Sequence, residues 1–537
     1  MPSPTSRASD MSALEPVLIG GQWRAPLDAQ GSFRAEDPSR AEAIGPAFPV
    51  SGPADIEAAM QAAIGVADEL NAAPPARIAD FLEGYAAAID ADADCLVTLA
   101  HEETALPVEP RLRSVELPRT SNQLRLAAKA VREYSWTDPV IDTQGGLRAH
   151  RASLNKPVLV YGPNNFPFAF NGIAGSDFAS AVAARNPVIA KGHPSHPSTS
   201  KRLAQLAHEA LLQAGLPAAA VQMLYRFDSQ LGIALAGDAR LGAIGFTGSR
   251  WGGLALKAAA DKAGVPMYAE LSSINPVFLL PGALAERGEA LAQEFFASCT
   301  MGSGQFCTNP GVLIVPRGEP GDAFVAAALK LFAEAEPKVL FSRGVQQGLA
   351  QAVHELLHAG AQLLTGGNAG DAYRFQPTLL EVDGEHFIAH AQALQAEAFG
   401  PASLIVRAAD TAAMPHIAAA FEGNLTGTIY RASDNSDDDA WHATARVLRN
   451  KVGRLIANKM PTGVAVSAAM NHGGPYPSTS HGGFTAVGMP AAIRRFTALH
   501  SYDNVPEGLL PPELRNRNPG GVQRRVDGHW TDGDITA

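Results

Sequence analysis

The sequence predicts an α/β protein with at least two domains, each built on a mainly parallel sheet. The chain of 537 residues is too long for one compact core. Over residues 157–264, short apolar runs alternate with helical patterns at the spacing of βαβ units. A second alternating stretch covers residues 291–459 and indicates another α/β domain.

Helices are expected along the first part of the chain. Residues 56–70 and 77–100 have apolar side chains at a spacing of three to four, and the pair Pro74-Pro75 separates them. The same spacing predicts a third helix over residues 119–134. At residues 157–162 the pattern changes to PVLVYG, a short apolar run rich in β-branched residues. Such a run is typical of a strand buried on both faces.

Strands and helices then alternate. In the first stretch we expect helices over residues 168–184, 201–215, 228–237 and 254–264 and strands over residues 186–191, 221–225 and 241–248. In the second we expect helices over residues 291–299 and 324–335 and strands over residues 311–316, 402–408 and 453–459. From His472 the chain becomes rich in Gly and Pro and then charged, which predicts an arm or tail.

Composition excludes several classes of protein. The net charge of -11 argues against nucleic-acid binding. The first residues, MPSPTSRASDMSALEP, lack the apolar region of a secretory signal, and no apolar run is long enough to span a bilayer. Cys95, Cys299 and Cys307 are an odd number without close spacing, so we expect no disulfide framework and no metal site. These features predict a cytoplasmic protein with reduced thiols.

Cys307 is the first candidate for chemistry. It stands in QFCTNP, directly after the turn MGSG, where glycines allow the backbone to approach a ligand and amides to face a developing negative charge. A buried structural thiol is the simpler interpretation of an isolated cysteine. Cys299, on the apolar face of EFFASC, fits that simpler interpretation.

Two further residues could assist a thiol. Glu270 ends the run VPMYAE, and a carboxylate between apolar segments is expensive to bury unless it is paired or acts as a base. A helix cap or a salt bridge would also explain it. Asn165 follows the strand at 157–162 and precedes Pro167, where we expect a helix to begin, so its amide could stabilise an oxyanion. By itself it could be an ordinary turn asparagine.

A last group of residues could bind a nucleotide. Lys191 ends a predicted strand, and ligands of open parallel sheets bind beyond the carboxyl ends of the strands. The segment GFTGS, with Gly245 and Ser249, precedes a helix and could hold a phosphate. Glu397, in EAFGP, is another carboxylate among apolar residues.

Six motifs occur in one order: NNFPF, PVIAK, GFTGS, AELSS, GQFCTNP and EAFGP. In this the chain resembles the NAD(P)-dependent aldehyde dehydrogenase superfamily from about Val17 to Phe496. The resemblance implies Cys307 as nucleophile, Glu270 as base and Asn165 as oxyanion donor. It also implies the following cofactor contacts: Lys191 on the adenosine ribose, Gly245 and Ser249 near the pyrophosphate, and Glu397 with Phe399 around the nicotinamide ribose.

The resemblance implies an aldehyde dehydrogenase-like architecture in three parts. A Rossmann-type cofactor domain would cover residues 16–140 and 155–283, and a catalytic α/β domain residues 284–470. Residues 141–154 and 471–537 would form an oligomerisation arm and a C-terminal tail, which implies a homo-oligomer, either a dimer or a tetramer. A small-molecule aldehyde is the implied substrate.

The chain also departs from the commonest family pattern. Pro194 stands three residues after Lys191, where many NAD-preferring members carry a glutamate, so we expect NADP as cofactor, with NAD also acceptable. The segments KGHPSHPSTS, SSINPVF, HGGPYPSTS and LLPPELRNRNPGG are similar to those of NADP-type fatty aldehyde and 2,5-dioxovalerate (α-ketoglutaric semialdehyde) dehydrogenases. A fatty aldehyde of medium or long chain is the alternative substrate.

The expected aldehyde tunnel has an apolar and a polar part. Phe166, Ala169 and Ile173 recur at helical spacing after Asn165 and should line it. The resemblance implies that the helix at 119–134 forms the outer wall of the tunnel, where Arg119 and Gln123, one turn apart on one face, could bind a substrate carboxylate. A surface salt bridge is an equally good explanation of Arg119.

Three other functions compete with this interpretation. The presence of Glu270 argues against a CoA-acylating relative, and the presence of both Glu270 and Cys307 argues against a non-catalytic one. A cysteine hydrolase would need a histidine beside Cys307, and no motif marks one among fifteen histidines.

Overall fold

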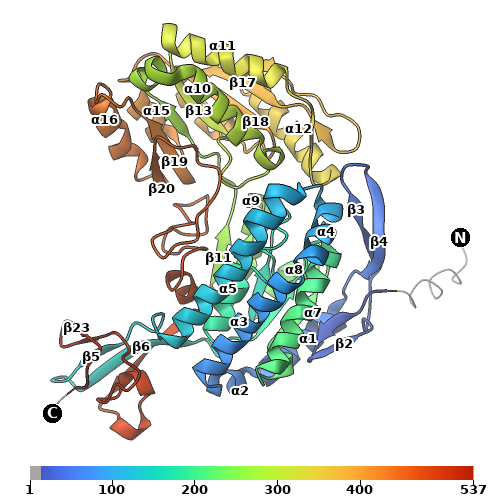
Figure 1. Ribbon diagram of the computed structural model, residues 1–537, viewed down its shortest axis with the longest axis vertical. Coiled ribbons are helices and arrows are strands. Elements are labelled where there is room, and N and C mark those ends of the chain that lie inside the picture. The colour runs from blue at the N-terminus through green and yellow to red at the C-terminus, as the bar shows by residue number, and fades with distance from the viewer. Residues whose placement is uncertain (1–13, 536–537) are drawn as a thin grey trace, which may run out of the picture.

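The computed structural model describes residues 14–535 and consists of two lobes and a projecting arm (Figure 1). Residues 1–13, which make up most of the N-terminal stretch without a signal pattern, lie outside the described residues. So do residues 536 and 537, the last two of the expected tail. In the view of Figure 1 the first lobe lies below, the second above, and the arm extends to the lower left.

The first lobe is built on a seven-stranded sheet in the order β11-β10-β7-β8-β9-β1-β2. Its strands are β1 (Val17–Ile19), β2 (Gln22–Arg24), β7 (Val158–Tyr161), β8 (Val188–Lys191), β9 (Val221–Leu224), β10 (Ala243–Thr247) and β11 (Met267–Glu270). From β7 to β11 all pairs are parallel, while β1 and β2 form an antiparallel edge. The strand β7 is buried along its whole length, as its continuous apolar sequence predicts.

Helices cover both faces of this sheet. They are α1 (Pro53–Gly65), α2 (Ala67–Ala72), α3 (Pro75–Ala91), α4 (Ala93–Thr104), the π-helix η3 (Val108–Glu116), α5 (Leu117–Arg132), α6 (Ser176–Ala183), α7 (Pro197–Gln213), the 3-10 turn η4 (Ala218–Ala220), α8 (Ser229–Ala236) and α9 (Arg250–Ala263). A hairpin of β3 (Ser32–Asp37) and β4 (Glu42–Pro49) lies beside the lobe (Figure 1).

The second lobe repeats this plan with another seven-stranded sheet, in the order β15-β17-β18-β13-β12-β19-β20. Its strands are β12 (Val277–Leu279), β13 (Val312–Pro316), β15 (Gln362–Thr365), β17 (Thr378–Asp383), β18 (Ala402–Ala408), β19 (Asn424–Tyr430) and β20 (Val452–Ala457). Its helices are α10 (Pro281–Thr300), the 3-10 turn η5 (Met301–Gly304), α11 (Glu319–Ala333), α12 (Arg343–His358), α13 (Gly384–Ala389), α14 (Ala391–Leu394), α15 (Met414–Ala420) and α16 (Asp438–Leu448). A small ladder joins β14 (Lys338–Val339) to β16 (Arg374–Phe375).

The arm is a five-stranded sheet in the order β21-β6-β5-β22-β23. Its strands are β5 (Val140–Asp142), β6 (Leu147–Ser153), β21 (Thr497–Asp503), β22 (Arg524–Val526) and β23 (His529–Thr531). Three short 3-10 turns, η6 (Ala491–Phe496), η7 (Glu507–Leu509) and η8 (Pro512–Leu514), flank β21. The outer strands β21 and β23 present free edges within the described residues.

Three expectations need correction. The helix expected over residues 168–184 begins only at Ser176, because turns occupy the segment before it, so no helix starts at Pro167. The strand β12, expected in the cofactor domain, pairs with β13 and β19 in the second sheet, so the lobes divide between residues 270 and 277. Residues 471–496 do not belong to the arm, whose C-terminal portion begins at β21.

Residues 461–490, here named the crossover segment, return from the second lobe to the first. At one end, the Thr462 hydroxyl donates to the Ser298 carbonyl of α10 at 3.2 Å. At the other, the Leu271 amide donates to the Ser478 carbonyl and the Ser480 amide to the Ala269 carbonyl, both at 2.8 Å. Backbone pairing with the end of β11 buries residues 477–480 of this segment, although its Gly- and Pro-rich composition resembles that of a tail.

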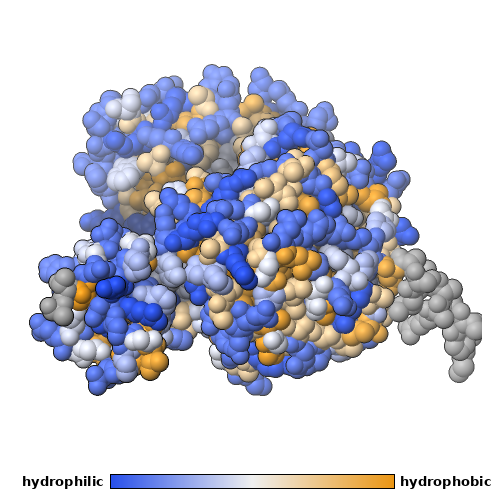
Figure 2. Space-filling view, turned by 60° about the horizontal axis from the view of Figure 1, so that its bottom comes forward, coloured by the Kyte–Doolittle hydropathy of each residue, from blue (hydrophilic) through white to orange (hydrophobic). Residues whose placement is uncertain are grey.

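Polar residues dominate the face shown in Figure 2, with apolar residues in scattered patches between them. Among the described residues, no helix is both long enough and apolar enough to cross a membrane.

Candidate active site

A cavity of about 920 Å³ lies between the lobes. Segments that follow β7 and β10, and the last residue of β11, form its wall in the first lobe, where ligands of parallel sheets bind. Residues of α12 and the segment 395–399 form the opposite wall. The cavity brings together seven of the residues singled out by the sequence: Asn165, Phe166, Ser249, Glu270, Cys307, Glu397 and Phe399.

A strained glycine turn positions Cys307. In η5, Gly302 and Gly304 have φ values of 54° and 71°, a region that glycine adopts most readily. A Cβ on Gly304 would lie 2.1 Å from the Gly400 carbonyl oxygen, so only glycine fits here. The Asn275 side-chain amide then donates to the Cys307 carbonyl at 2.9 Å. The turn and this bond explain why the thiol points into the cleft rather than into the core.

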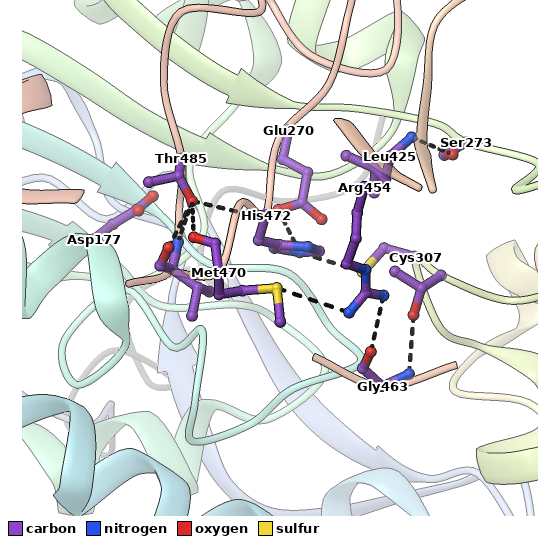
Figure 3. A network of polar contacts seen from close by, with 12 residues as sticks. Asp177, Glu270, Ser273, Cys307, Leu425, Arg454, Gly463, Met470, His472 and Thr485 are labelled. Carbon is purple, nitrogen blue, oxygen red and sulfur yellow. Dashed lines mark hydrogen bonds and ion pairs between the residues drawn. The ribbon is translucent and has the colours of Figure 1, made fainter. Parts of the chain in front are cut away.

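The thiol faces a histidine and a carboxylate. The Cys307 Sγ lies 3.7 Å from Nε2 of His472, and the same nitrogen lies 3.0 Å from Glu270 Oε2 (Figure 3). The 3.0 Å contact is off the hydrogen-bond axis, and among the described residues neither Glu270 oxygen accepts a hydrogen bond. Burial raises the pKa of the Cys307 thiol well above its usual value, and the charge of Glu270 raises it further.

His472 is the functional candidate that the sequence analysis missed. It lies in the crossover segment, within the range assigned to the arm, and only the fold brings it to Cys307. No motif in the sequence marks His472, so the sequence analysis did not place it beside the thiol. One carboxylate oxygen of Glu270, Sγ of Cys307 and one ring nitrogen of His472 all lie within 4.8 Å of one another.

Asn165 is held from two sides in the turn after β7. Its side-chain amide donates to the Gln305 carbonyl at 3.0 Å, two residues before Cys307. Nη2 of Arg111 donates to the Asn165 carbonyl at 2.9 Å, and Arg111 also forms an ion pair with the buried Glu116. The amide group therefore lies beside the thiol, but not at a helix N-terminus as expected.

The expected cofactor residues do not all reach the cavity. Ser249 lines it and caps α9 by accepting a hydrogen bond from the Gly252 amide at 3.3 Å. Gly245 lies in the middle of β10, where a Cβ would meet the Asp177 carboxylate at 2.7 Å, so it packs inside the lobe. Its neighbour Gly248 lines the cavity instead. Across the cleft, Oε1 of Glu397 accepts a hydrogen bond from the Ser273 amide at 3.2 Å.

Lys191 ends β8 in a cationic environment. Burial lowers its pKa to about 8, and the charge of Arg226 acts in the same direction. Burial and the charge of Lys191 hold the pKa of His193 well below its usual value. Pro194 follows directly in the turn after β8. The sequence analysis missed Arg226, because only the parallel pairing of β8 and β9 brings the C-terminal ends of these two strands together.

The apolar wall of the cavity differs in part from the wall that the sequence predicts. Phe166 lines the cavity and packs against Phe170 and Phe306, with ring centroids 5.2 and 5.5 Å apart. Ala169 is buried in the same cluster, behind these rings. Ile173 is buried in the core of the first lobe and does not reach the cavity, because the segment is not a helix.

Arg119 and Gln123 lie one turn apart on α5, as expected. The Arg119 guanidinium carbon lies 5.6 and 5.1 Å from the ring centroids of Phe166 and Phe170. Within residues 14–535 no carboxylate forms an ion pair with Arg119, and its buried Nε and Nη2 have no hydrogen-bond partner. The Gln123 amide donates to the Ala169 carbonyl at 3.1 Å, while its Oε1 is also without a partner. Arg119 is thus no surface salt bridge.

Two parallel sheets around one cleft, with a thiol at its base, form the architecture of a dinucleotide-dependent dehydrogenase. The chain belongs to the aldehyde dehydrogenase family, whose sequence description matches residues 23–501. This confirms the fold class and the family that the six motifs predict, and with them the oxidation of an aldehyde with a nicotinamide cofactor.

Three similar proteins illustrate the range of the family. The alpha-ketoglutaric semialdehyde dehydrogenase 2 of Azospirillum brasilense is 40% identical over 532 residues, which cover 95% of this chain and 98% of that relative. The alpha-ketoglutaric semialdehyde dehydrogenase of Acinetobacter baylyi is 36% identical over 84% of this chain and 87% of its own length. The crystal structure of PnpE in complex with nicotinamide adenine dinucleotide superposes with a TM-score of 0.78 at 21% identity, covering 91% of this chain and 97% of that one.

Proposed function

We propose that this chain oxidises α-ketoglutaric semialdehyde (2,5-dioxovalerate) to 2-oxoglutarate, with NADP as the preferred cofactor. The observation that carries the proposal is the guanidinium of Arg119, which packs against Phe166 and Phe170 of the cavity wall and has no anionic partner among the described residues. A buried cation of this kind suits a substrate carboxylate. The similarity to two relatives named for this semialdehyde supports the same substrate.

The residues around the thiol support a covalent mechanism. The Cys307 thiolate attacks the aldehyde carbonyl, and the Asn165 side chain stabilises the oxyanion that forms. When bound, a nicotinamide would supply the acceptor for the hydride that leaves this adduct, and Cys307 would then hold the acyl group as a thioester. Glu270, whose oxygens have no hydrogen-bond partner within the described chain, then takes a proton from the water that hydrolyses the thioester.

The chain's residues fit a dinucleotide. Gly248 and Ser249, directly before α9, line the cavity where a pyrophosphate would meet the N-terminus of that helix. Glu397 and Phe399 face this wall from the second lobe and would contact the nicotinamide ribose. Lys191 would bind the adenosine ribose from the end of β8.

The 2′-phosphate of NADP would meet the cationic group of Lys191 and Arg226. Both charges lie near the turn that contains Pro194, and Arg226 stands two residues after Leu224, which pairs with Lys191. Since a phosphate is bound best by arginine and lysine, this group supports NADP over NAD.

Replacement of Arg119 tests the substrate. In Arg119→Met, which keeps most of the side-chain volume, we expect KM for α-ketoglutaric semialdehyde to rise about tenfold or more, the loss of one charge-assisted contact. KM for hexanal should change little, because hexanal has no carboxylate. The measurement is steady-state NADPH formation with each aldehyde.

Arg125 provides a matched control on the same helix. It pairs with Asp90 at the surface, at 2.5 Å, so Arg125→Met should leave both KM values unchanged. Equal losses for both aldehydes in Arg119→Met, or no loss for either, would remove Arg119 from substrate binding. The apolar rings of Phe166, Phe170 and Phe306 would then favour the alternative, a fatty aldehyde of medium or long chain.

Replacement of Arg226 tests the cofactor. Arg226→Ala should raise KM for NADP about tenfold while leaving KM for NAD within about twofold, since only NADP carries the additional phosphate. Arg240→Ala is the control, because Arg240 pairs with Glu57 and Asp238 away from the cavity. A wild-type enzyme that prefers NAD in kcat/KM would contradict the proposal.

The arm supports assembly into a homo-oligomer, dimer or tetramer. The free edge of β21 carries Leu499, which is 75% exposed, and β23 carries Trp530, 67% exposed. Exposed strand edges with large apolar side chains are suited to pairing with a second copy. The cytoplasmic location stays a prediction from the sequence.

A further inference from the structure

We propose that His472 is a catalytic residue that accepts the proton of the Cys307 thiol before the aldehyde is attacked. The inference rests on Cys307 being the nucleophile of the proposed oxidation. One imidazole nitrogen faces both reacting groups, at 3.7 Å from Sγ of Cys307 and 3.0 Å from Oε2 of Glu270 (Figure 3).

The surroundings of the thiol make a proton acceptor necessary. A thiolate formed alone would lie beside the carboxylate of Glu270, and two like charges in a buried site repel each other strongly. If the proton moves from Sγ to Nε2, the S–H bond breaks and an N–H bond forms, and the net charge of the group does not change. The imidazolium then lies between the thiolate and the carboxylate and is attracted to both.

His472 is held where this transfer requires it. Its backbone amide donates to Oγ1 of Thr485 at 2.9 Å, and its carbonyl accepts from the Ala486 amide at 2.7 Å. The ring packs against Phe170, with centroids 5.7 Å apart. A side chain that only filled space in a loop would not need such a defined position beside a thiol.

A second residue secures the loop that carries the histidine. The guanidinium of Arg454, on β20, donates to the carbonyls of Pro461 and Gly463 at 3.1 Å and contacts Sδ of Met470 at 3.8 Å (Figure 3). Arg454 thus joins the start of the crossover segment to its portion next to His472. It is a positioning residue for the segment.

Other charged groups also act on the thiol and must be considered in any pH dependence. Arg119 on α5 favours the thiolate, whereas Glu270 on β11 and Glu397 in the second lobe oppose it. The thiolate in turn interacts with Arg454 on β20. None of these groups can accept the proton of the Cys307 thiol at neutral pH and thereby become positively charged beside Glu270. A histidine can do both.

Alkylation of the full-length enzyme without cofactor tests the proposal. The neutral reagent iodoacetamide reacts with the thiolate, and mass spectrometry of the digested protein gives the rate at Cys307 separately from Cys95 and Cys299. We expect the wild-type rate to reach a plateau near neutral pH, below the range of an ordinary cysteine at about 8.5. In His472→Asn and His472→Gln, the rate at pH 7 should fall at least about tenfold and should then rise continuously with pH.

His481→Asn is the matched control. His481 lies in the same segment and packs against Tyr268 and Phe484, not against Cys307. It should alkylate like the wild type. A His472 variant whose alkylation rate and pH profile equal those of the wild type would overturn the proposal. A wild-type alkylation rate that rises only above the pH range of an ordinary cysteine would also overturn it, without any variant. If Cys307 is essential for oxidation in either case, the proposed function stands and only the role of His472 falls.

Discussion

Cys299 and Cys307 lie eight residues apart, and their surroundings differ. The difference shows that burial of a thiol and its reactivity are separate properties. Both lie in the second lobe on either side of η5. Cys299 is fully buried on α10, in a cluster of apolar side chains that includes Phe295 and Phe332. Within residues 14–535 its one polar contact is the Asn309 amide at 3.9 Å, and burial raises its pKa to about 12.

The pKa of the Cys307 thiol is shifted in the same direction as that of Cys299, but the neighbours of Cys307 are different. Burial raises the pKa of its thiol too, yet the group faces His472, Glu270 and a cavity of about 920 Å³. Burial alone therefore does not identify a reactive cysteine. What distinguishes Cys307 is a histidine within contact distance and a cavity that a substrate could enter.

The largest effect should come from removing the reactive thiol. Cys307→Ala should lower kcat for aldehyde oxidation at least about 1,000-fold, since no covalent adduct can form. Binding of NADP, followed by fluorescence titration, should remain. An enzyme that kept a tenth of the wild-type kcat would make the two thiols equivalent and would end the assignment of Cys307.

Next in size is the loss of the base beside that thiol. Glu270→Gln should slow steady-state turnover about 100-fold or more, because water is no longer activated to hydrolyse the thioester. Stopped-flow absorbance should still show a rapid burst of NADPH of about one equivalent per active site. Unchanged turnover would mean that the base lies elsewhere.

The smallest effect should come from the buried thiol. Cys299→Ala removes one sulfur from a packed cluster, and we expect the melting temperature to fall by about 2 °C, corresponding to roughly 1 kcal/mol. The rate constant kcat should stay within about twofold of the wild type. A large loss of activity without unfolding would show that Cys299 also takes part in the chemistry.

The difference between the thiols also shows what the sequence can predict. Strands such as β7 and β13 are short apolar runs whose burial follows from their own residues, so the fold class is predictable from local patterns. The motifs likewise indicate Asn165, Glu270 and Cys307, and the fold brings all three to one cleft. The roles of these residues in the reaction stay predictions until the variants are measured.

Contacts between distant segments are not visible in such patterns. His472 stands 165 residues after Cys307, in a stretch whose Gly and Pro content indicates a tail. Arg226 becomes a neighbour of Lys191 only through the pairing of β8 with β9. The helix wrongly expected over residues 168–175 has a related cause, because apolar residues needed around the cavity imitate helical spacing without a helix.

The crossover segment has a consequence for the order in which the protein matures. During synthesis the strand with Glu270 and the turn with Cys307 leave the ribosome long before residues 461–490, which must return to pair with the end of β11. Contacts of such long sequence separation form late. The emerging chain thus exposes Cys307 before His472 can lie beside it, so we expect the cluster of Glu270, Cys307 and His472 to be complete only after residues 461–490 have folded back.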